Sequence, residues 1–236
     1  MELLGLPEPV VGEVVRRVNR FVAEVSVGGR VERAYLNNTG RLAEYLSGGR
    51  LCYCLRKGRG ATGLRLIAVE DPHGAALIDT ALQMKAFEAA LEGGLLPWAP
   101  CSVAARNPRL GRSVLDYLLS CGGEPVYVEL KSAVLRDGAY AAYPDCPTLR
   151  GRRHVADLIE HVRAGGRGLI VFVAALPGVS AFRPYERGDP EVARLLEAAA
   201  RVGVELRAIA IHYEPATSTV VLDNPDLPVH LSTRPR

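Results

Sequence analysis

Short stretches of alternating apolar and polar residues fill the first eighty positions of this 236-residue chain. A period of two is typical of strands with one buried face. It predicts strands over 12–27, 31–36, 51–55, 63–70 and 75–78, a hairpin turn at Gly28-Gly29 and a short helix over 39–46. Several short strands with one short helix favour a small closed β-barrel of the OB type.

After residue 80 the pattern changes to helices alternating with strands. Apolar residues recur at helical spacing over 80–91, 147–163 and 190–202, and strands are predicted over 102–106, 112–119, 125–135, 168–175, 204–213 and 219–222. This order implies an α/β sandwich around a mixed sheet. We therefore predict an α+β protein with two domains, an OB-like β-barrel over residues 1–80 and an α/β domain over residues 81–236.

Composition is that of an ordinary globular protein, with 48% hydrophobic and 23% charged residues. No apolar run approaches a membrane span, and the N-terminal region lacks the basic start of a signal peptide, so we expect a cytoplasmic location. The five cysteines show no CxxC spacing, so neither a zinc site nor a disulfide framework is expected. Residues 233–236 are the one stretch that resembles a disordered tail.

The clearest chemical signal is the Glu129-Leu130-Lys131 triplet within a predicted strand. Alternate side chains of a strand share a face, so Glu129 and Lys131 point one way, and Asp116 joins them if its own predicted strand pairs with theirs. Two carboxylates and an ammonium at a sheet edge are typical of a magnesium-dependent phosphodiesterase. The alternative is a solvated ion pair on an exposed strand face. Lysine is scarce, with only three in the chain, which favours a selected ammonium at position 131.

Two longer segments resemble the signature of the sugar fermentation stimulation protein A family. They are residues 128–132, with sequence VELKS, and residues 143–154, with sequence YPDCPTLRGRRH; residues 17–21, 38–42 and the Asp116 strand fit the same pattern. The resemblance implies an N-terminal OB-like domain and a C-terminal domain of the PD-(D/E)xK nuclease type. It also implies DNA binding and an association with the regulation of sugar utilisation.

The resemblance also implies a metal site. Asp116 and Glu129 would hold Mg²⁺ or Mn²⁺, with the Leu130 carbonyl as a further ligand. Lys131 would orient a water or stabilise charge on the phosphate, and it could act as a base only if burial and the field of the metal depressed its pKa. Glu88, on the predicted helix over 80–91, is the candidate third carboxylate, with an exposed helix residue as the alternative.

Basic residues near a predicted helix start form a second candidate region, because a helix N-terminus attracts anions. Thr148 can cap this helix, and the alternative is a capped helix with a solvated basic turn. In the barrel, arginines with Phe21 and Tyr35 could contact nucleic acid, the alternative being a purely structural barrel. The residues expected to contact nucleic acid are Arg17, Arg20, Arg41, Thr148, Arg150, Arg153 and His154.

Two departures from the family pattern lie in the N-terminal domain. Tyr35 and Asn37 stand where a histidine and a proline are expected, and the loose segment 59–63 replaces a basic stretch. The sequence thus predicts a protein that binds duplex or branched DNA, as a possible homodimer, with a nuclease-like site using Mg²⁺ or Mn²⁺. A non-enzymatic DNA-binding regulator and a domain that binds a nucleotide or sugar phosphate are the alternatives.

Overall fold

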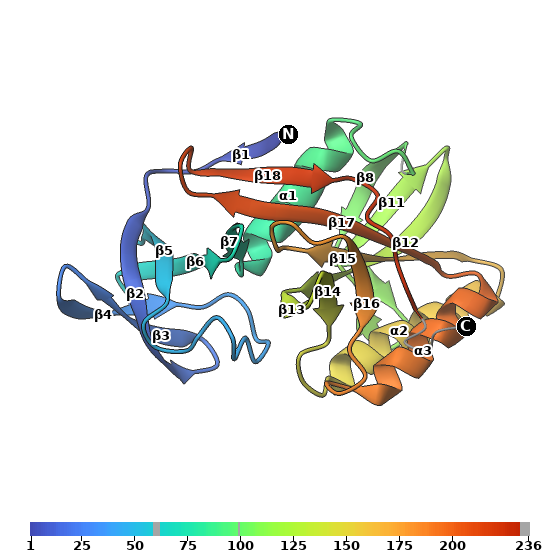
Figure 1. Cartoon of the computed structure of the whole chain (residues 1–236). Coiled ribbons are helices and arrows are strands. Elements are labelled where there is room, and N and C mark those ends of the chain that lie inside the picture. The colour runs from blue at the N-terminus through green and yellow to red at the C-terminus, as the bar shows by residue number, and fades with distance from the viewer. Residues whose placement is uncertain (59–61, 99, 232–236) are drawn as a thin grey trace. The chain divides into compact units, whose positions relative to one another are not determined.

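The computed structural model describes residues 1–58, 62–98 and 100–231 (Figure 1). Segment 59–61 and the predicted tail over 233–236 therefore lie outside the described residues. The chain divides into two compact units: the first comprises Met1–Ala89, Ala175–Gly178 and Ala210–Asp223, and the second comprises Ala90–Ala174, Val179–Ile209 and the residues from Asn224 on. The predicted domain boundary at residue 80 remains a prediction.

Five strands of the first unit form a closed barrel. They are β2 (Val10–Asn19), β3 (Val22–Val27), β4 (Arg30–Tyr35), β5 (Leu51–Arg56) and β6 (Leu64–Asp71). Four antiparallel pairings link them in the order β4-β3-β2-β5-β6, and a parallel pairing of β4 with β6 closes the ring. The predicted OB-like barrel is confirmed. Gly28 and Gly29 have φ of 55° and 79°, as the predicted two-residue hairpin turn requires.

The predicted short helix over 39–46 is wrong. The segment makes one helical turn, in which the Leu46 amide donates to the Leu42 carbonyl at 2.9 Å. Leu42 has a φ of 49°, a left-handed conformation that interrupts an α-helix, and the Arg17 guanidinium donates to the carbonyls of Gly40 at 2.5 Å and Arg41 at 2.9 Å.

The first unit also contains three short strands and most of a helix. They are β1 (Glu2–Gly5), β7 (Gly74–Leu77), β18 (Thr219–Asn224) and α1 (Thr80–Glu92), and β1, which the sequence pattern did not predict, pairs antiparallel with β18. Among the helices of the described residues, none is long and apolar enough to cross a membrane.

A buried histidine lies beside two carboxylates in the first unit. His212, on β17 (Glu205–Glu214), places Nδ1 2.7 Å from Asp223 Oδ2 and Nε2 3.8 Å from Glu214 Oε2. The hydrogen bond to Asp223 raises the pKa of His212, against the lowering effect of burial. The protonated imidazole is therefore stabilised in the folded protein.

We expect His212→Gln to destabilise the protein by about 1 kcal/mol at pH 6 and by less at pH 9. A raised folded pKa gives stability that is fully present below the unfolded pKa of about 6.5 and is lost as pH rises through the folded pKa. Urea unfolding at both pH values measures the difference. His73→Gln, at an exposed turn position, is the control. A cost for His212→Gln that is the same at both pH values would contradict the prediction.

The second unit is built on a mixed sheet, as predicted. The sheet order is β8 (Cys101–Arg106), β11 (Tyr117–Cys121), β12 (Glu124–Ala133), β15 (Arg167–Ala174), then β17. Neighbours β8, β11 and β12 are antiparallel, whereas β12 and β15 are parallel. Helix α2 (Leu149–Arg163) lies in the connection between the two parallel strands, and it packs beside α3 (Pro190–Val202) (Figure 1).

Two smaller pieces complete the second unit. A three-stranded sheet comprises β13 (Leu135–Asp137), β14 (Tyr140–Tyr143) and β16 (Ala181–Pro184), and a hairpin comprises β9 (Arg109–Leu110) and β10 (Ser113–Val114). The single strand predicted over 112–119 is wrong, because the chain breaks between β10 and β11 and places Asp116 in a bend. Separating the two strands frees the Asp116 side chain from the sheet alternation.

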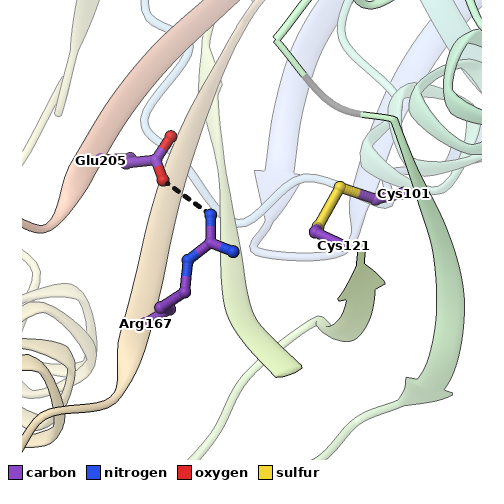
Figure 2. Close-up of a disulfide and its surroundings, with 4 residues drawn as sticks. All are labelled: Cys101, Cys121, Arg167 and Glu205. Carbon is purple, nitrogen blue, oxygen red and sulfur yellow. Dashed lines mark hydrogen bonds and ion pairs between the residues drawn. A yellow bond between two sulfur atoms is a disulfide. The ribbon is translucent and has the colours of Figure 1, made fainter. Parts of the chain in front are cut away.

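A disulfide joins Cys101 to Cys121, so the expectation of no disulfide is wrong (Figure 2). The two cysteines are register partners on the antiparallel strands β8 and β11. Closing the chain over a separation of 20 residues stabilises the fold by about 3 kcal/mol. Figure 2 also draws the exposed ion pair of Arg167 with Glu205 at 3.3 Å, a kind that contributes little.

Candidate metal and phosphodiester site

Asp116 is anchored to strand β12 by its backbone and by its side chain. Its amide donates to the Val128 carbonyl at 3.2 Å, and its Oδ2 accepts from the Leu130 amide at 2.7 Å. The antiparallel pairing of β11 with β12, which sets Tyr117 opposite Val128, brings the bend to this position. The Asp116 carboxylate therefore lies beside the backbone of the Glu129-Leu130-Lys131 triplet.

Glu129 and Lys131 form a buried ion pair. Glu129 is 5% exposed and Lys131 is 6% exposed. Lys131 Nζ donates to Glu129 Oε1 at 2.7 Å. This burial excludes the alternative of a solvated surface pair. The two charges are hydrogen-bonded to each other because burying a charge without a partner is costly. Lys131 Nζ also lies 5.9 Å from the centre of the Tyr143 ring, which faces it from β14.

His154 reaches the same carboxylate from helix α2. The ring is 2% exposed, and its Nδ1 lies 2.6 Å from Glu129 Oε1. The Arg150 Nε donates to His154 Nε2 at 3.3 Å, and an arginine is always a donor. His154 Nε2 is therefore the acceptor and Nδ1 carries the proton, so a neutral imidazole donates to Glu129.

Both donors bind the same oxygen of Glu129, and the other oxygen has no donor among the described residues. Oε1 accepts from both Lys131 and His154, whereas Oε2 is buried and has no hydrogen-bond partner among the described residues. A buried carboxylate oxygen without a partner costs free energy unless an ion or a water satisfies it. Lys131 and His154 thus fix the orientation of the carboxylate and present Oε2 to a ligand.

The charges of the site influence one another. Burial, and after it the charge of Glu129, raises the pKa of Asp116 to about 6. Burial would also raise the pKa of Glu129, but Lys131 and His154 outweigh it and hold that pKa below its usual value. Burial would lower the pKa of Lys131, yet the Tyr143 phenol and Glu129 raise it, so Lys131 is an ammonium at neutral pH. Without a cation, the surrounding groups therefore do not depress the pKa of Lys131.

This donor set fits a hard divalent cation. Carboxylate and carbonyl oxygens are the ligands that Mg²⁺ and Ca²⁺ prefer. Across the described part of the chain, no three His, Cys, Asp or Glu side chains are grouped closely enough to hold an ion by themselves. Mg²⁺ is often bound by only one or two carboxylates and keeps several waters, so Asp116 and Glu129 suffice as its side-chain ligands.

Comparison with known proteins identifies the family. The model described as "Sugar fermentation stimulation protein RE domain" matches residues 81–217, and the model described as "SfsA N-terminal OB domain" matches residues 15–78. The chain belongs to the sugar fermentation stimulation protein family. The α+β fold is thereby shown, with an OB-like barrel and a second, α/β domain built on a mixed sheet.

Relatives in this family match almost the whole chain. A homolog from Pyrococcus furiosus is 52% identical over 201 residues, which cover 85% of this chain and 87% of the relative. One from Archaeoglobus fulgidus is 48% identical over 229 residues, covering 97% and 99%. The solved structure of Pyrococcus furiosus SfsA in complex with Ca²⁺ is 46% identical, has a TM-score of 0.93 and covers 98% of this chain and 99% of that one.

The start of α2 brings together several residues of the family signature. Thr148 caps the helix, as predicted, and its side chain accepts from the Gly151 amide at 3.0 Å. A Cβ at Gly151 would lie 2.7 Å from the Tyr143 hydroxyl, so only glycine lets the helix start approach this ring. Arg153 is exposed. The predicted contact of His154 with a phosphate does not fit, because the imidazole is buried against Glu129.

Two supporting residues were missed. Tyr143 lies beside Lys131, and Asp189 is fully buried, where it accepts from the Thr148 amide at 2.9 Å and from Arg152. Asp189 also caps α3 through the amides of Glu191 and Val192. The Asp-Pro pair at the predicted helix start was the sequence signal for Asp189, and the family signature over residues 143–154, which begins with Tyr143, was the signal for Tyr143.

The remaining predicted residues lie in the first unit. Arg17 is occupied by backbone carbonyls of the loop that follows β4, which does not fit a contact with nucleic acid. Arg20 and Arg41 are exposed, and the Arg20 guanidinium lies 5.9 Å from the Phe21 ring centre. Glu88 is half-buried on α1, and its role as a third carboxylate remains a prediction.

Proposed function

We propose that this protein binds DNA and hydrolyses its phosphodiester bonds with a divalent cation, Mg²⁺ or Mn²⁺. The observation that carries the proposal is the buried, unpartnered Oε2 of Glu129, held in place by Lys131 and His154 beside Asp116. The complex of Pyrococcus furiosus SfsA with Ca²⁺ supports it, since that ion takes the same kinds of oxygen ligand.

The charge of the site also supports a cation. Asp116 and Glu129 contribute two carboxylates, Lys131 contributes one ammonium, and the hydrogen bonds of His154 leave its imidazole neutral. The sum is one excess negative charge, which a divalent cation would neutralise and overcompensate. The resulting positive field would attract the phosphate of a DNA strand.

The cation would be held by Asp116, by Glu129 Oε2 and by the Leu130 carbonyl, and it would supply charge neutralisation and a more acidic bound water. The Lys131 ammonium keeps its proton and stabilises the negative charge that develops on the phosphate oxygens. His154 acts through Glu129, because it fixes the carboxylate and does not itself face the substrate.

The proposal predicts that the wild type nicks supercoiled plasmid or cuts branched DNA in Mg²⁺ or Mn²⁺. Glu129→Ala should slow this cleavage at least about a hundredfold, because removing one such group costs that much or more. Gel electrophoresis measures the products. Glu160→Ala, which removes an exposed glutamate of α2, is the matched control and should cut at the wild-type rate.

Cleavage by both the wild type and Glu129→Ala, or by neither, would overturn the nuclease proposal. DNA binding without cutting, unchanged by chelation and by Glu129→Ala, would instead support the regulator. Comparing the plasmid with the branched substrate shows which form of DNA the site prefers.

A further inference from the structure

The β9–β10 hairpin carries two exposed arginines directly before the candidate site. Arg109 and Arg112 are exposed, and neither forms an ion pair with a carboxylate of the described residues. Only Leu115 separates the end of β10 from Asp116. The hairpin therefore places two arginines, neither in an ion pair within the described residues, close in sequence to the proposed metal ligand Asp116.

The hairpin is rigidly connected to the site. The Asn107 amide donates to the Asp116 carbonyl at 3.0 Å, and the Leu115 amide donates to the Pro108 carbonyl at 3.0 Å. The tip packs on α2, where a Cβ at Gly111, whose φ is +56°, would lie 3.2 Å from the Asp157 carboxyl carbon. These contacts hold the arginines at a fixed place relative to Asp116.

Two further exposed arginines lie on segments that contact residues of the site. Arg153 on α2 and Arg187 are exposed, and neither forms an ion pair in the described structure. The loop of Arg187 is tied to β14, because the Tyr185 amide donates to the Tyr143 carbonyl at 2.8 Å. Several other arginines of the second unit pair with carboxylates. Those pairs are Arg163–Glu160, Arg167–Glu205, Arg194–Glu191, Arg201–Glu197 and Arg207–Asp226.

We infer that the β9–β10 hairpin is a clamp for double-stranded DNA, in which Arg109 and Arg112 bind backbone phosphates next to the one that is cleaved. The inference rests on the proposed function and specifies that the substrate is a polymer with many phosphates. A sugar monophosphate has no second phosphate for these side chains, whereas a DNA strand has one at every nucleotide.

The composition of the hairpin favours duplex over single-stranded DNA. Sites for single strands combine a basic groove with aromatic side chains on which bases stack. The hairpin residues 109–114 are Arg-Leu-Gly-Arg-Ser-Val and include no aromatic residue. Arginines on a rigid element without a stacking surface suit the phosphate backbone, which positions DNA without reading its sequence.

The test is the salt dependence of DNA binding by the full chain in EDTA. Arg109→Gln/Arg112→Gln should reduce the slope of log affinity against log salt by about 2 and weaken duplex binding about tenfold at 0.1 M salt. Fluorescence anisotropy with a labelled duplex measures both. Arg163→Gln/Arg194→Gln removes the same charge from ion-paired positions of the second unit and should leave the slope unchanged. Arg109→Lys/Arg112→Lys keeps the charge and should retain the slope.

An unchanged slope in the Gln variant would overturn the clamp, even if the wild type cuts DNA. A reduced slope would support it, even if no cleavage is seen, so the clamp and the nuclease proposal fail separately. A single-stranded oligonucleotide or an RNA duplex that binds as tightly, with the same loss in the variant, would overturn the assignment to duplex DNA. The hydrolysis of bis(p-nitrophenyl) phosphate, which has one phosphate, should be equal in all three double variants.

Discussion

Glu129→Gln is expected to abolish the thermal stabilisation that Mn²⁺ gives the wild type and to slow DNA cleavage by about a thousandfold. The glutamine oxygen can still accept from Lys131 and His154, so its amide nitrogen takes the place of the buried Oε2. An amide nitrogen donates hydrogen bonds and does not ligate a hard cation. The side chain keeps its shape while the proposed ligand is lost.

Thermal unfolding with and without the cation provides a readout that does not depend on catalysis. At a cation concentration one hundred times the dissociation constant, binding to the folded state adds about 2.7 kcal/mol of stability. The wild type and the control Glu160→Gln, at an exposed position of α2, should both show this gain. Equal stabilisation of Glu129→Gln would show that the cation does not use this oxygen.

The same variant separates the two roles of Glu129. Without a cation, Glu129→Gln leaves the Lys131 ammonium buried beside a neutral partner, which costs about 3–5 kcal/mol. Adding Lys131→Met removes the unpaired charge and should restore much of that stability without restoring cation binding. A double variant as unstable as the single one would show that the ion pair is not the cause.

Much of the site could be predicted from residue spacing. Strand alternation placed Glu129 and Lys131 on one face, and the antiparallel pairing of β11 with β12 brought Asp116 to them. The sequence could not show that the pair is buried, since burial depends on α2 covering this face. The place of His154 was missed, although it shares a helical stripe with Val155 and Leu158, which are buried with it.

Features that depend on tertiary register were missed. Cys101 and Cys121 are far apart in sequence, and only the pairing of β8 with β11 sets them opposite each other. The contact of Arg17, on β2, with the carbonyls of Gly40 and Arg41 in the loop over 39–46 depends on tertiary structure in the same way. Local propensity predicts neither contact, because in each case the two partners lie on different elements of the fold.

Asp79→Ala is expected to destabilise the protein by about 3–5 kcal/mol. Asp79 is fully buried, and its carboxylate accepts from Arg65 Nε at 2.5 Å and Nη2 at 2.6 Å. Its Oδ1 also accepts from the Leu82 amide at 3.0 Å, which caps α1. One substitution therefore removes a bidentate ion pair, leaves the Arg65 guanidinium without its partner and opens a helix start.

The measurement is urea unfolding of Asp79→Ala, Arg65→Met and the double variant. We expect Arg65→Met to cost less than Asp79→Ala, because it does not touch the cap, and the pair to show a coupling free energy of about 2 kcal/mol. Glu24→Ala, which breaks an ion pair with the exposed Arg16 on the same barrel, should cost less than about 1 kcal/mol. Additive effects of the two substitutions would mean that the cap, and not the ion pair, is what makes Asp79 important for the junction of barrel and helix.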